Sequence, residues 1–476
     1  MTIKKILYFL VISLVCNISD AQTLSWSATQ TISSGSQSGY GRPRVVTTAN
    51  NEPLIMWTKT STPKSVKVSK WNGTSFSAPY DIVLLSLEVT GFIGPEIASK
   101  GDTVYVIFLS ALSPNNFVYL ISSFDGGLTF SDTVRVSDNS NTNKFGMPNV
   151  VVNMDGNPIV SYIESSTSWT DWKQMVKVSS DFGNTFSPAF DVSDLAPGEP
   201  CDCCKSSLVA NGNEVFLLFR NNDMDVRNSY VAKSTDGGLT FSLLNDIDDD
   251  DWVINACPSS SPQGMLSGDS IIVARRSGAN NRDEILVSGV NTNDLQYDYN
   301  HKIDPISFGV QDHPEIAGKG DTIGIVWQDN RNSYMDCFFS YSITGAYNLS
   351  GSVVMNDTNN IGSQTAPDIC FSKGTFHFVY VNVGVHEILY RTATFASSTA
   401  VSEIEKNQIA IYPNPATDKI KITTELMGDL IIKDLEGKKI LSLTKENPRK
   451  QIDISFLPVG IYTIEIKGLT SKFIKQ

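Results

Sequence analysis

The stretch SFDGGLTF at residues 123–130 decides the fold that this sequence predicts. Similar stretches, SSDFGNTF at residues 179–186 and STDGGLTF at residues 234–241, follow at intervals of 55 or 56 residues. In each copy the aspartate can bond to nearby backbone N–H groups and the glycine can adopt a positive φ, as a tight hairpin turn requires. A degenerate copy, SKWNGTSF at residues 69–76, has Trp71 where the others have aspartate. The copies therefore predict β-hairpins that recur at a fixed period.

A longer repeat contains these hairpins. A turn residue followed by strand-forming residues recurs every 50 to 56 residues, at Asn51, Gly101, Gly156, Gly212, Gly268, Gly320 and Gly374. A proline or cysteine opens a shorter strand before each turn, at Pro43, Pro95, Pro148, Cys204, Cys257, Pro314 and Pro367. Four strands in a repeat of about 50 residues are typical of propeller blades. Residues 24–33 can supply the outer strand that the last repeat lacks. We therefore predict an all-β fold, a seven-bladed β-propeller over residues 22–396.

The composition excludes several classes of protein. Of the 476 residues, 41% are hydrophobic, which is enough to build a core and excludes global disorder. Seven cysteines in this length are too few for a disulfide-dense scaffold. The formal net charge of −13 argues against a protein that binds double-stranded nucleic acid, because such a protein needs a basic surface.

The N-terminus predicts secretion. Lys4 and Lys5 precede an apolar run that is too short to span a bilayer, and a small-x-small cleavage site ends at Ala21. We therefore expect a signal peptide over residues 1–21 that directs the chain to the Sec pathway. The alternative is a lipoprotein anchored through Cys16. No other stretch is long and apolar enough to predict a transmembrane segment.

The C-terminal segment, residues 408–476, has its own character. It opens with the residues Tyr412, Pro413, Asn414 and Pro415, continues as short alternating strands, and ends in the basic tail SKFIKQ. It resembles the type A sorting domain of the type IX secretion system of Bacteroidetes-type bacteria. The resemblance implies a small immunoglobulin-like β-sandwich, the type IX machinery as a partner, and a secreted or outer-surface location, with residues 397–407 as a linker. The alternative is an appended immunoglobulin-like module with a local role.

The hairpin copies resemble the Asp-box (BNR) repeats of sialidases and related propellers. The resemblance implies a sialidase-like propeller in which Asp125, Asp181 and Asp236 are structural, because Asp boxes join outer strands away from the usual site. It is specific for the fold and does not by itself assign an activity.

A ligand site is expected on the face where first strands begin and second strands end, which we call the axial face. The predicted ligand-binding residues there are Arg42, Arg44, Arg220, Arg275, Arg276, His313, Asp329 and Arg331. Guanidinium groups offer planar paired donors that suit a carboxylate or a sulfate. The alternative for each arginine is a pairing with a neighbouring carboxylate on a solvated loop.

Sialidases hold the substrate carboxylate with three arginines and use an Asp acid/base and a Tyr nucleophile assisted by Glu. The segment YGRPR at residues 40–44 resembles their first arginine motif but lacks its intervening residue. The catalytic candidates by this resemblance are Arg42, Glu164, Arg220 and Arg276. The Tyr–Glu pair is not identifiable, although Tyr230 and Tyr334 are possible tyrosines, so the catalytic residues stay open.

Four cysteines open two adjacent repeats: Cys201, Cys203 and Cys204 open the fourth, and Cys257 opens the fifth. In a secreted protein they are candidates for two disulfides. The alternative is a soft-metal site of these four thiolates with His313, suited to Cu(I) or Zn. An acidic loop over residues 246–251 is a further possible Ca²⁺ site, although it lacks the Gly and the terminal Glu of a calcium loop.

These features predict a secreted or cell-surface protein whose partner is an extracellular, anionic glycan. One hypothesis is an enzyme that cleaves the glycan, as an exo-sialidase-like glycoside hydrolase or a polysaccharide lyase. A second is a non-catalytic binding or adhesion module. A third is a metal or redox site built on the cysteines.

Overall fold

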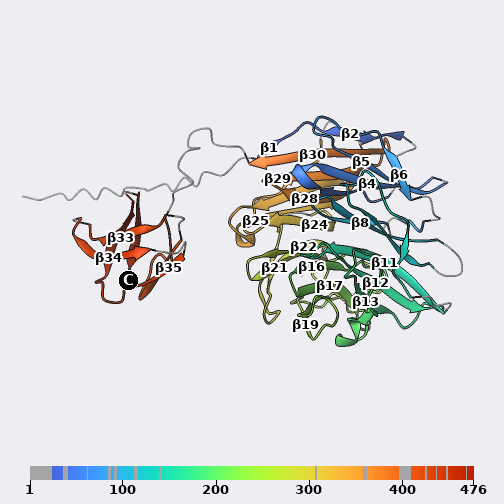
Figure 1. Cartoon of the computed structure of the whole chain (residues 1–476). Helices are drawn as coiled ribbons and strands as arrows, with labels where there is room; N and C mark the ends of the chain where they lie inside the picture. The colour runs from blue at the N-terminus through green and yellow to red at the C-terminus, as the bar shows by residue number, and fades with distance from the viewer. Residues whose placement is uncertain are drawn as a thin grey trace, which may run out of the picture. The chain divides into compact units, whose positions relative to one another are not determined.

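The structure is a computed structural model, and it divides the chain into two compact units, Met1–Phe395 and Ala396–Gln476 (Figure 1). It describes residues 24–35, 41–61, 63–83, 87–90, 94–111, 116–138, 142–305, 308–357, 362–395, 409–423, 426–435, 437–445, 449–467 and 469–476. The predicted signal peptide, Cys16 and the predicted linker lie outside the described residues. In the described part of the chain, no helix is long and apolar enough to cross a membrane.

The described residues of the first unit form seven antiparallel sheets. Each sheet is given in chain order from its innermost strand outward: the first contains β3 (Arg44–Thr47), β4 (Pro53–Lys59), β5 (Ser65–Lys70) and β6 (Tyr80–Val83), and the second contains β7 (Glu96–Lys100), β8 (Thr103–Leu109), β9 (Val118–Ser123) and β10 (Val134–Arg135). The third contains β11 (Asn143–Val152), β12 (Pro158–Ser166), β13 (Lys173–Val178) and β14 (Phe190–Asp191), and the fourth contains β15 (Glu199–Pro200) with β16 (Ser207–Asn211), β17 (Glu214–Asn222), β18 (Ser229–Ser234) and β19 (Leu243–Asp246). The fifth contains β20 (Gln263–Ser267), β21 (Ser270–Ser277), β22 (Glu284–Asn291) and β23 (Tyr297–Lys302), and the sixth contains β24 (Gln311–Lys319), β25 (Thr322–Asp329), β26 (Asp336–Ser342) and β27 (Val353–Val354). The seventh is β28 (Gln364–Ser372), β29 (Thr375–Asn382) and β30 (Glu387–Phe395), with β1 (Leu24–Trp26) and β2 (Gln30–Ser33). Three short 3-10 helices lie at Ala49–Asn51, Ser193–Leu195 and Ala346–Asn348.

The innermost strands form a closed ring. Each contacts the next in the order β3, β7, β11, β16, β20, β24 and β28, and β28 contacts β3 again. Both N-terminal strands pair with β30, so that Leu24 lies opposite Phe395 (blue beside orange in Figure 1). This pairing covers the edge of the last sheet, which would otherwise be open to other chains. The prediction of an all-β, sialidase-like propeller is confirmed.

The core of the first unit lies between adjacent sheets. Trp57 of β4 is fully buried and packs with Val379 and Tyr390 of the seventh sheet, across the junction where the ring closes. Trp327 of β25 is equally buried and packs with Ile272 of the fifth sheet. Fully burying such large apolar side chains contributes most of the favourable free energy of folding. The apolar residues of each sheet therefore hold it against both of its neighbours.

Three inner strands begin with a β-bulge at an X-Pro pair. The register shifts at Met147, His313 and Ala366, each of which has φ near 50° and directly precedes a proline. Proline cannot donate to a strand ladder, so it is confined to irregular positions such as these. A bulge also redirects the side chains beside it. The prolines that mark the repeats therefore set the direction of the residues at the axial face.

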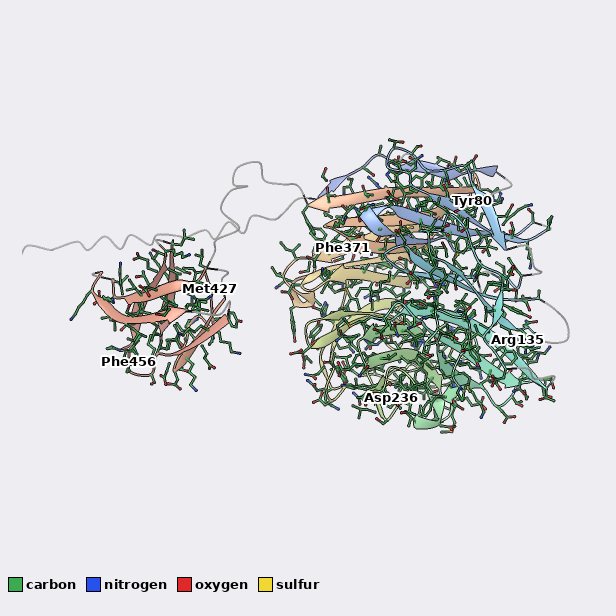
Figure 2. The ribbon with its side chains drawn as sticks, in the orientation of Figure 1. Tyr80, Arg135, Asp236, Phe371, Met427 and Phe456 are labelled. Atoms are coloured by element: carbon green, nitrogen blue, oxygen red, sulfur yellow. A yellow bond between two sulfur atoms is a disulfide. The ribbon has the colours of Figure 1, made fainter. Side chains whose placement is uncertain are left out.

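The Asp-box turns are held by bonds within eight residues. Asp125 accepts the backbone N–H groups of Leu128 and Thr129, each at 2.9 Å, and the Thr129 hydroxyl at 2.6 Å. The slight burial of Asp125 would raise its pKa, but the bonds from Thr129 and Ser123 lower it to about 2. Gly126 N also bonds to Asp102 O in the β7–β8 turn, so these hairpins lie opposite the axial face. Figure 2 labels Asp236 in a third turn of the same kind.

The second unit has two small sheets around its own core. One sheet contains β31 (Ala410–Tyr412), β32 (Lys419–Thr423) and β35 (Arg449–Asp453), and the other contains β34 (Lys439–Lys445), β33 (Gly428–Lys433), β36 (Gly460–Ile466) and β37 (Leu469–Lys475). Ile420, Ile432 and Phe473 are fully buried between them. Asn414 of the YPNP motif accepts the Ile474 N–H at 2.8 Å, which ties the motif to the last strand.

Candidate functional site

Charged side chains from five sheets meet where the inner strands begin on the axial face. We call this group the axial cluster; its members are Arg42, Arg44, Glu96, Lys205, His313, Glu315 and Asp368. The ring of inner strands brings these residues together from distant parts of the sequence. A concentration of buried charge at one place is a physical mark of a functional site.

Glu96 is the centre of a buried ion network. Its carboxylate accepts hydrogen bonds from Arg44 at 2.6 and 2.8 Å and from Lys205 at 2.7 Å. Arg44 also lies 3.7 Å from Glu315. Burial alone would raise the pKa of Glu96, but Arg44 and Lys205 outweigh it and lower the pKa to about 2. The carboxylate therefore stays charged and joins the first, second and fourth sheets at the axis.

Asp368 is the carboxyl group of the axial cluster that titrates near neutral pH. It is buried and accepts the Val45 N–H at 2.7 Å. Burial raises its pKa to about 7; Arg44 opposes this shift, and Glu315 adds to it. Asp368 therefore changes charge in a pH range where ordinary aspartates stay ionised.

Asp368→Asn is expected to reduce the pH dependence of stability. An aspartate whose pKa rises from 3.8 to about 7 binds its proton more tightly in the folded state than in the unfolded state. Its contribution to stability is therefore complete below about pH 4 and is lost as the pH rises toward about 7. Asparagine can still accept the Val45 N–H but does not titrate. Urea unfolding measures the free energy of unfolding at about pH 5 and at about pH 8. Between these two values the native chain should lose more of it than Asp368→Asn loses. An equal loss in both chains would contradict the prediction.

Arg42 and His313 lie at the accessible side of the axial cluster. Arg42 is partly exposed, and its guanidinium donates to Nδ1 of His313. Burial and then Arg42 and Arg276 hold the pKa of His313 well below its usual value, so the imidazole is neutral. Because Nδ1 accepts, the ring proton is assigned to Nε2, which lies 3.6 Å from Asp312.

Arg42 has an unbalanced charge. Among the described residues, Arg42 and Arg220 are the two of the six predicted arginines with no carboxylate within ion-pair distance, and Arg220 instead donates to three backbone carbonyls. Burial and the neighbouring Arg44 both lower its pKa, since they disfavour a second positive charge there. An anion bound beside Arg42 would favour its charged form and so oppose both of these shifts of the pKa.

Arg276 approaches the same place from β21. It bonds to Asp283 at 2.8 and 3.0 Å and to Asp312 at 3.0 Å. The Cζ atom of its guanidinium lies 5.5 Å from the centroid of the Trp252 ring. Its side chain keeps partial exposure. Asp312 therefore links Arg276 to His313, and Arg276 is held in a fixed orientation beside Arg42 and His313.

Four of the predicted ligand-binding residues are held by partners within the protein. Arg220 is buried and donates to three backbone carbonyls, of Ser260, Arg227 and Arg276. Arg275 is fully buried against Asp248, because adjacent strand residues point to opposite faces and Arg276 takes the axial one. The structure pairs Asp329 with Arg331.

Arg331 also binds Asp304 and covers the ring of Phe338 at 4.0 Å. Its charge is thus neutralised by two local carboxylates, as the alternative interpretation expects. Of the six predicted arginines, Arg42, Arg44 and Arg276 therefore lie at the axial cluster, and ligand binding by the other three stays a prediction.

The predicted catalytic carboxylate and tyrosines do not join this group by any contact of the described residues. Glu164 lies near the end of β12, accepts a bond from Asn143, and has a pKa raised by its partial burial. The pKa of Tyr230 is raised by burial and by Asp246, which belongs to the outer strand β19. Tyr334 is exposed on a loop. No contact among the described residues thus joins these candidates into a sialidase-type Tyr–Glu pair around Arg42.

The four clustered cysteines form two disulfides, Cys201–Cys204 and Cys203–Cys257. The segment 201–206 interrupts the inner strand of the fourth sheet, so β15 and β16 both pair with β17. Sulfurs in disulfides are not thiolate ligands, so the predicted Cu or Zn site of these cysteines with His313 would require the reduced thiols, and metal binding there stays a prediction. Cys203–Cys257 joins the segment that opens the fourth sheet to the one that opens the fifth, and Cys201–Cys204 closes a short loop within the fourth.

The aspartates of the acidic loop bond to other side chains of the same chain. Asp248 binds Arg275, Asp249 accepts the Tyr297 hydroxyl, and Asp246 and Asp251 both accept from Asn228. Ca²⁺ binding there stays a prediction.

The sequence reasoning missed Glu96, Lys205, Glu315 and Asp368. A signal was present, because each directly follows the proline or cysteine that opens its repeat, as Arg44 does. Five of the seven repeats carry a charged residue at this position, and the third carries Asn149. In the third, sixth and seventh sheets this residue directly follows the bulge of the inner strand.

Residues 11–261 match the BNR repeat-like domain, and residues 410–476 match the secretion system C-terminal sorting domain. The first match covers more than half of the chain, so the chain belongs to the BNR repeat-like domain family. The sorting domain assigns the protein to type IX secretion, which delivers it to the cell surface or the extracellular space.

Solved structures with similar folds include a PL25 ulvan lyase bound to -[GlcA(1-4)Rha3S]-. It is 9% identical, with 76% of this chain and 95% of that chain covered and a TM-score of 0.51. The NanB sialidase of Streptococcus pneumoniae is 11% identical, with 70% and 71% covered and a TM-score of 0.45. A protein of unknown function from Dyadobacter fermentans DSM 18053 is 12% identical, with 78% and 99% covered and a TM-score of 0.49. No curated protein matches the chain. At these identities the likeness shows the fold alone.

Proposed function

We propose that the protein binds an extracellular anionic glycan, carboxylated or sulfated, on the axial face. The observation that carries the proposal is Arg42, a partly exposed residue beside Arg44 with no carboxylate partner among the described residues. A bound carboxylate or sulfate would supply the missing negative charge through two parallel hydrogen bonds. The type IX sorting domain supports an extracellular ligand. The shared fold with a lyase bound to a glycan that contains glucuronate and a sulfated rhamnose supports a polysaccharide.

Binding without cleavage is the form of this function that the geometry favours. Nδ1 of His313 is occupied by Arg42, and its Nε2–H faces Asp312, so the ring has no free nitrogen for a substrate. Asp368, which titrates near neutral pH, is buried and does not reach the surface. A binding module needs neither group free.

Cleavage is a second candidate, which one feature supports. The Asp312–His313 pair is arranged as a base with an orienting carboxylate. If a bound anion draws Arg42 away, Nδ1 becomes free to accept a proton from the sugar, as a lyase or hydrolase requires. Release of unsaturated or reducing sugar ends, lost in His313→Ala, would show this activity.

Arg42→Ala is expected to weaken anionic polysaccharide binding by about 10- to 100-fold, because a bond from a charged donor contributes about 1.5–3 kcal/mol. The measurement is titration of the mature chain with dextran sulfate, polygalacturonate, alginate and neutral dextran. Binding of the charged polymers should also weaken as salt rises.

The matched control is Arg135→Ala, on the outer strand β10 (labelled in Figure 2), which should bind like the native chain. The melting temperature of each variant separates a binding defect from unfolding. The proposal fails if the native chain binds none of the three anionic polymers, or if a folded Arg42→Ala binds them as tightly.

A further inference from the structure

A pair of tryptophans lies on the axial face of the third sheet. The loop between β12 and β13 carries Trp169 and Trp172, whose ring centroids are 5.7 Å apart with an interplanar angle of 33°. Trp169 is 55% exposed. Because β12 is a second strand, its end and this loop share the face of the axial cluster. An exposed tryptophan of this size on a candidate binding face needs an explanation.

The loop holds Trp169 in a fixed position. Ser166 N bonds to Thr170 O at 2.8 Å, the Ser166 and Thr170 hydroxyls bond at 2.8 Å, and Trp169 N bonds to Ser166 O at 3.0 Å. Trp169 itself has a φ of 60°, a left-handed conformation that a bulky side chain rarely adopts. Such a conformation costs free energy and persists where the surrounding structure enforces it, often at binding sites.

The tryptophan pair is connected to the axial cluster. Trp172 packs on a buried group that contains Met147, Cys201, Cys203 and Cys204. Lys205, the next residue in the chain, reaches Glu96 of the axial cluster at 2.7 Å. The disulfide-bonded segment thus supports the tryptophans on one side and the axial cluster on the other.

We propose that Trp169, backed by Trp172, is a stacking subsite for a sugar ring of the same anionic glycan that Arg42 binds. This inference rests on the proposed function. One face of a pyranose ring presents C–H groups, which pack on the flat apolar surface of an indole, while the hydroxyls at the ring edge stay in water. Lys144 Nζ lies 5.9 Å from the Trp169 ring centroid and gives this subsite the charge that an acidic sugar requires.

The two subsites define the length of the ligand. Trp169 belongs to the third sheet, and Arg42 precedes the first strand of the first sheet. A single sugar that occupies one subsite does not occupy the other. The ligand is therefore a chain of several sugars, and Trp169 should contribute to the binding of polymers but not of single sugars.

The test compares Trp169→Ala, Trp169→Gly and Trp169→Phe with the native chain. The probe is whichever of dextran sulfate, polygalacturonate and alginate the native chain binds most tightly. We expect the alanine and glycine variants to bind about tenfold more weakly, and the phenylalanine variant to keep most of the affinity. Phe124→Ala is the matched control, since Phe124 is 57% exposed but lies in an Asp-box turn on the opposite face.

The glycine variant separates a binding role from a structural one. Glycine adopts a φ of 60° without strain, so Trp169→Gly should melt no lower than the native chain while it loses affinity. If it melts lower and binds normally, Trp169 is structural and the inference is overturned. If all Trp169 variants bind normally while Arg42→Ala does not, the inference fails and the proposed function stands. If the native chain binds none of the probes, both fail.

Discussion

Glu96→Ala is expected to lower the free energy of unfolding of the propeller by about 3–5 kcal/mol, the typical cost of removing one partner from a buried ion pair. Glu96 is 7% exposed and neutralises both Arg44 and Lys205. Lys205 can lose its proton when it is left alone, but a guanidinium cannot, so Arg44 would stay charged and buried. The loss also removes one link among the first, second and fourth sheets at the axis.

Urea unfolding followed by tryptophan fluorescence measures this loss. Glu214→Ala is the matched control: Glu214 pairs with Lys233 at 2.6 Å, but its side chain is 36% exposed. Water screens that pair, so its removal should cost about 1 kcal/mol or less. Equal losses in the two variants would show that the Glu96 network is no more important than a surface ion pair, contrary to our interpretation of the axial cluster.

The double substitution Cys203→Ser with Cys257→Ser is expected to lower the free energy of unfolding by about 4 kcal/mol. These cysteines are 54 residues apart, so their bond removes much freedom from the unfolded chain. The segment that follows Cys257 also orients the site, since Pro258 O accepts from Arg276 and the Ser260 hydroxyl accepts from His313 N. We therefore expect weaker binding of the anionic polysaccharide as well.

The other disulfide provides the comparison. Cys201 and Cys204 are only 3 residues apart, so their bond restricts the unfolded chain less. Replacing both with serine should therefore lower the free energy of unfolding by about half as much. Unfolding without a reductant, together with polysaccharide titration, gives both readouts. If the Cys203–Cys257 variant were as stable as the native chain, the bond between the fourth and fifth sheets would have no structural importance.

The repeat and the fold follow from the sequence because the physics involved is local. An Asp-box turn is complete within eight residues, from Ser123 to Phe130, and its bonds are the same in any environment. Alternating apolar residues between such turns give strands, and a regular period gives equivalent sheets. The sorting domain is readable for the same reason, since its YPNP motif is a short contiguous segment.

The site was only partly predictable, because pairing between distant charges decides it. Arg42 and His313 are 271 residues apart, and Arg44 and Glu96 are 52 residues apart. Nothing near Arg275 in the sequence distinguishes it from Arg276, yet burial against Asp248 removes the first from the surface and leaves the second partly exposed. Which cation keeps an unbalanced charge depends on every carboxylate that the closed ring brings within reach.

The sequence by itself determined that this chain is a secreted propeller with Asp-box turns, because hydrogen bonds within a turn and apolar alternation along a strand act over a few residues. Only the tertiary structure decided that Arg42 has no carboxylate partner among the described residues and that Trp169 shares its face. Charge balance and exposure are properties of the assembled ring, because they depend on side chains that are far apart in the sequence and meet only when the ring closes.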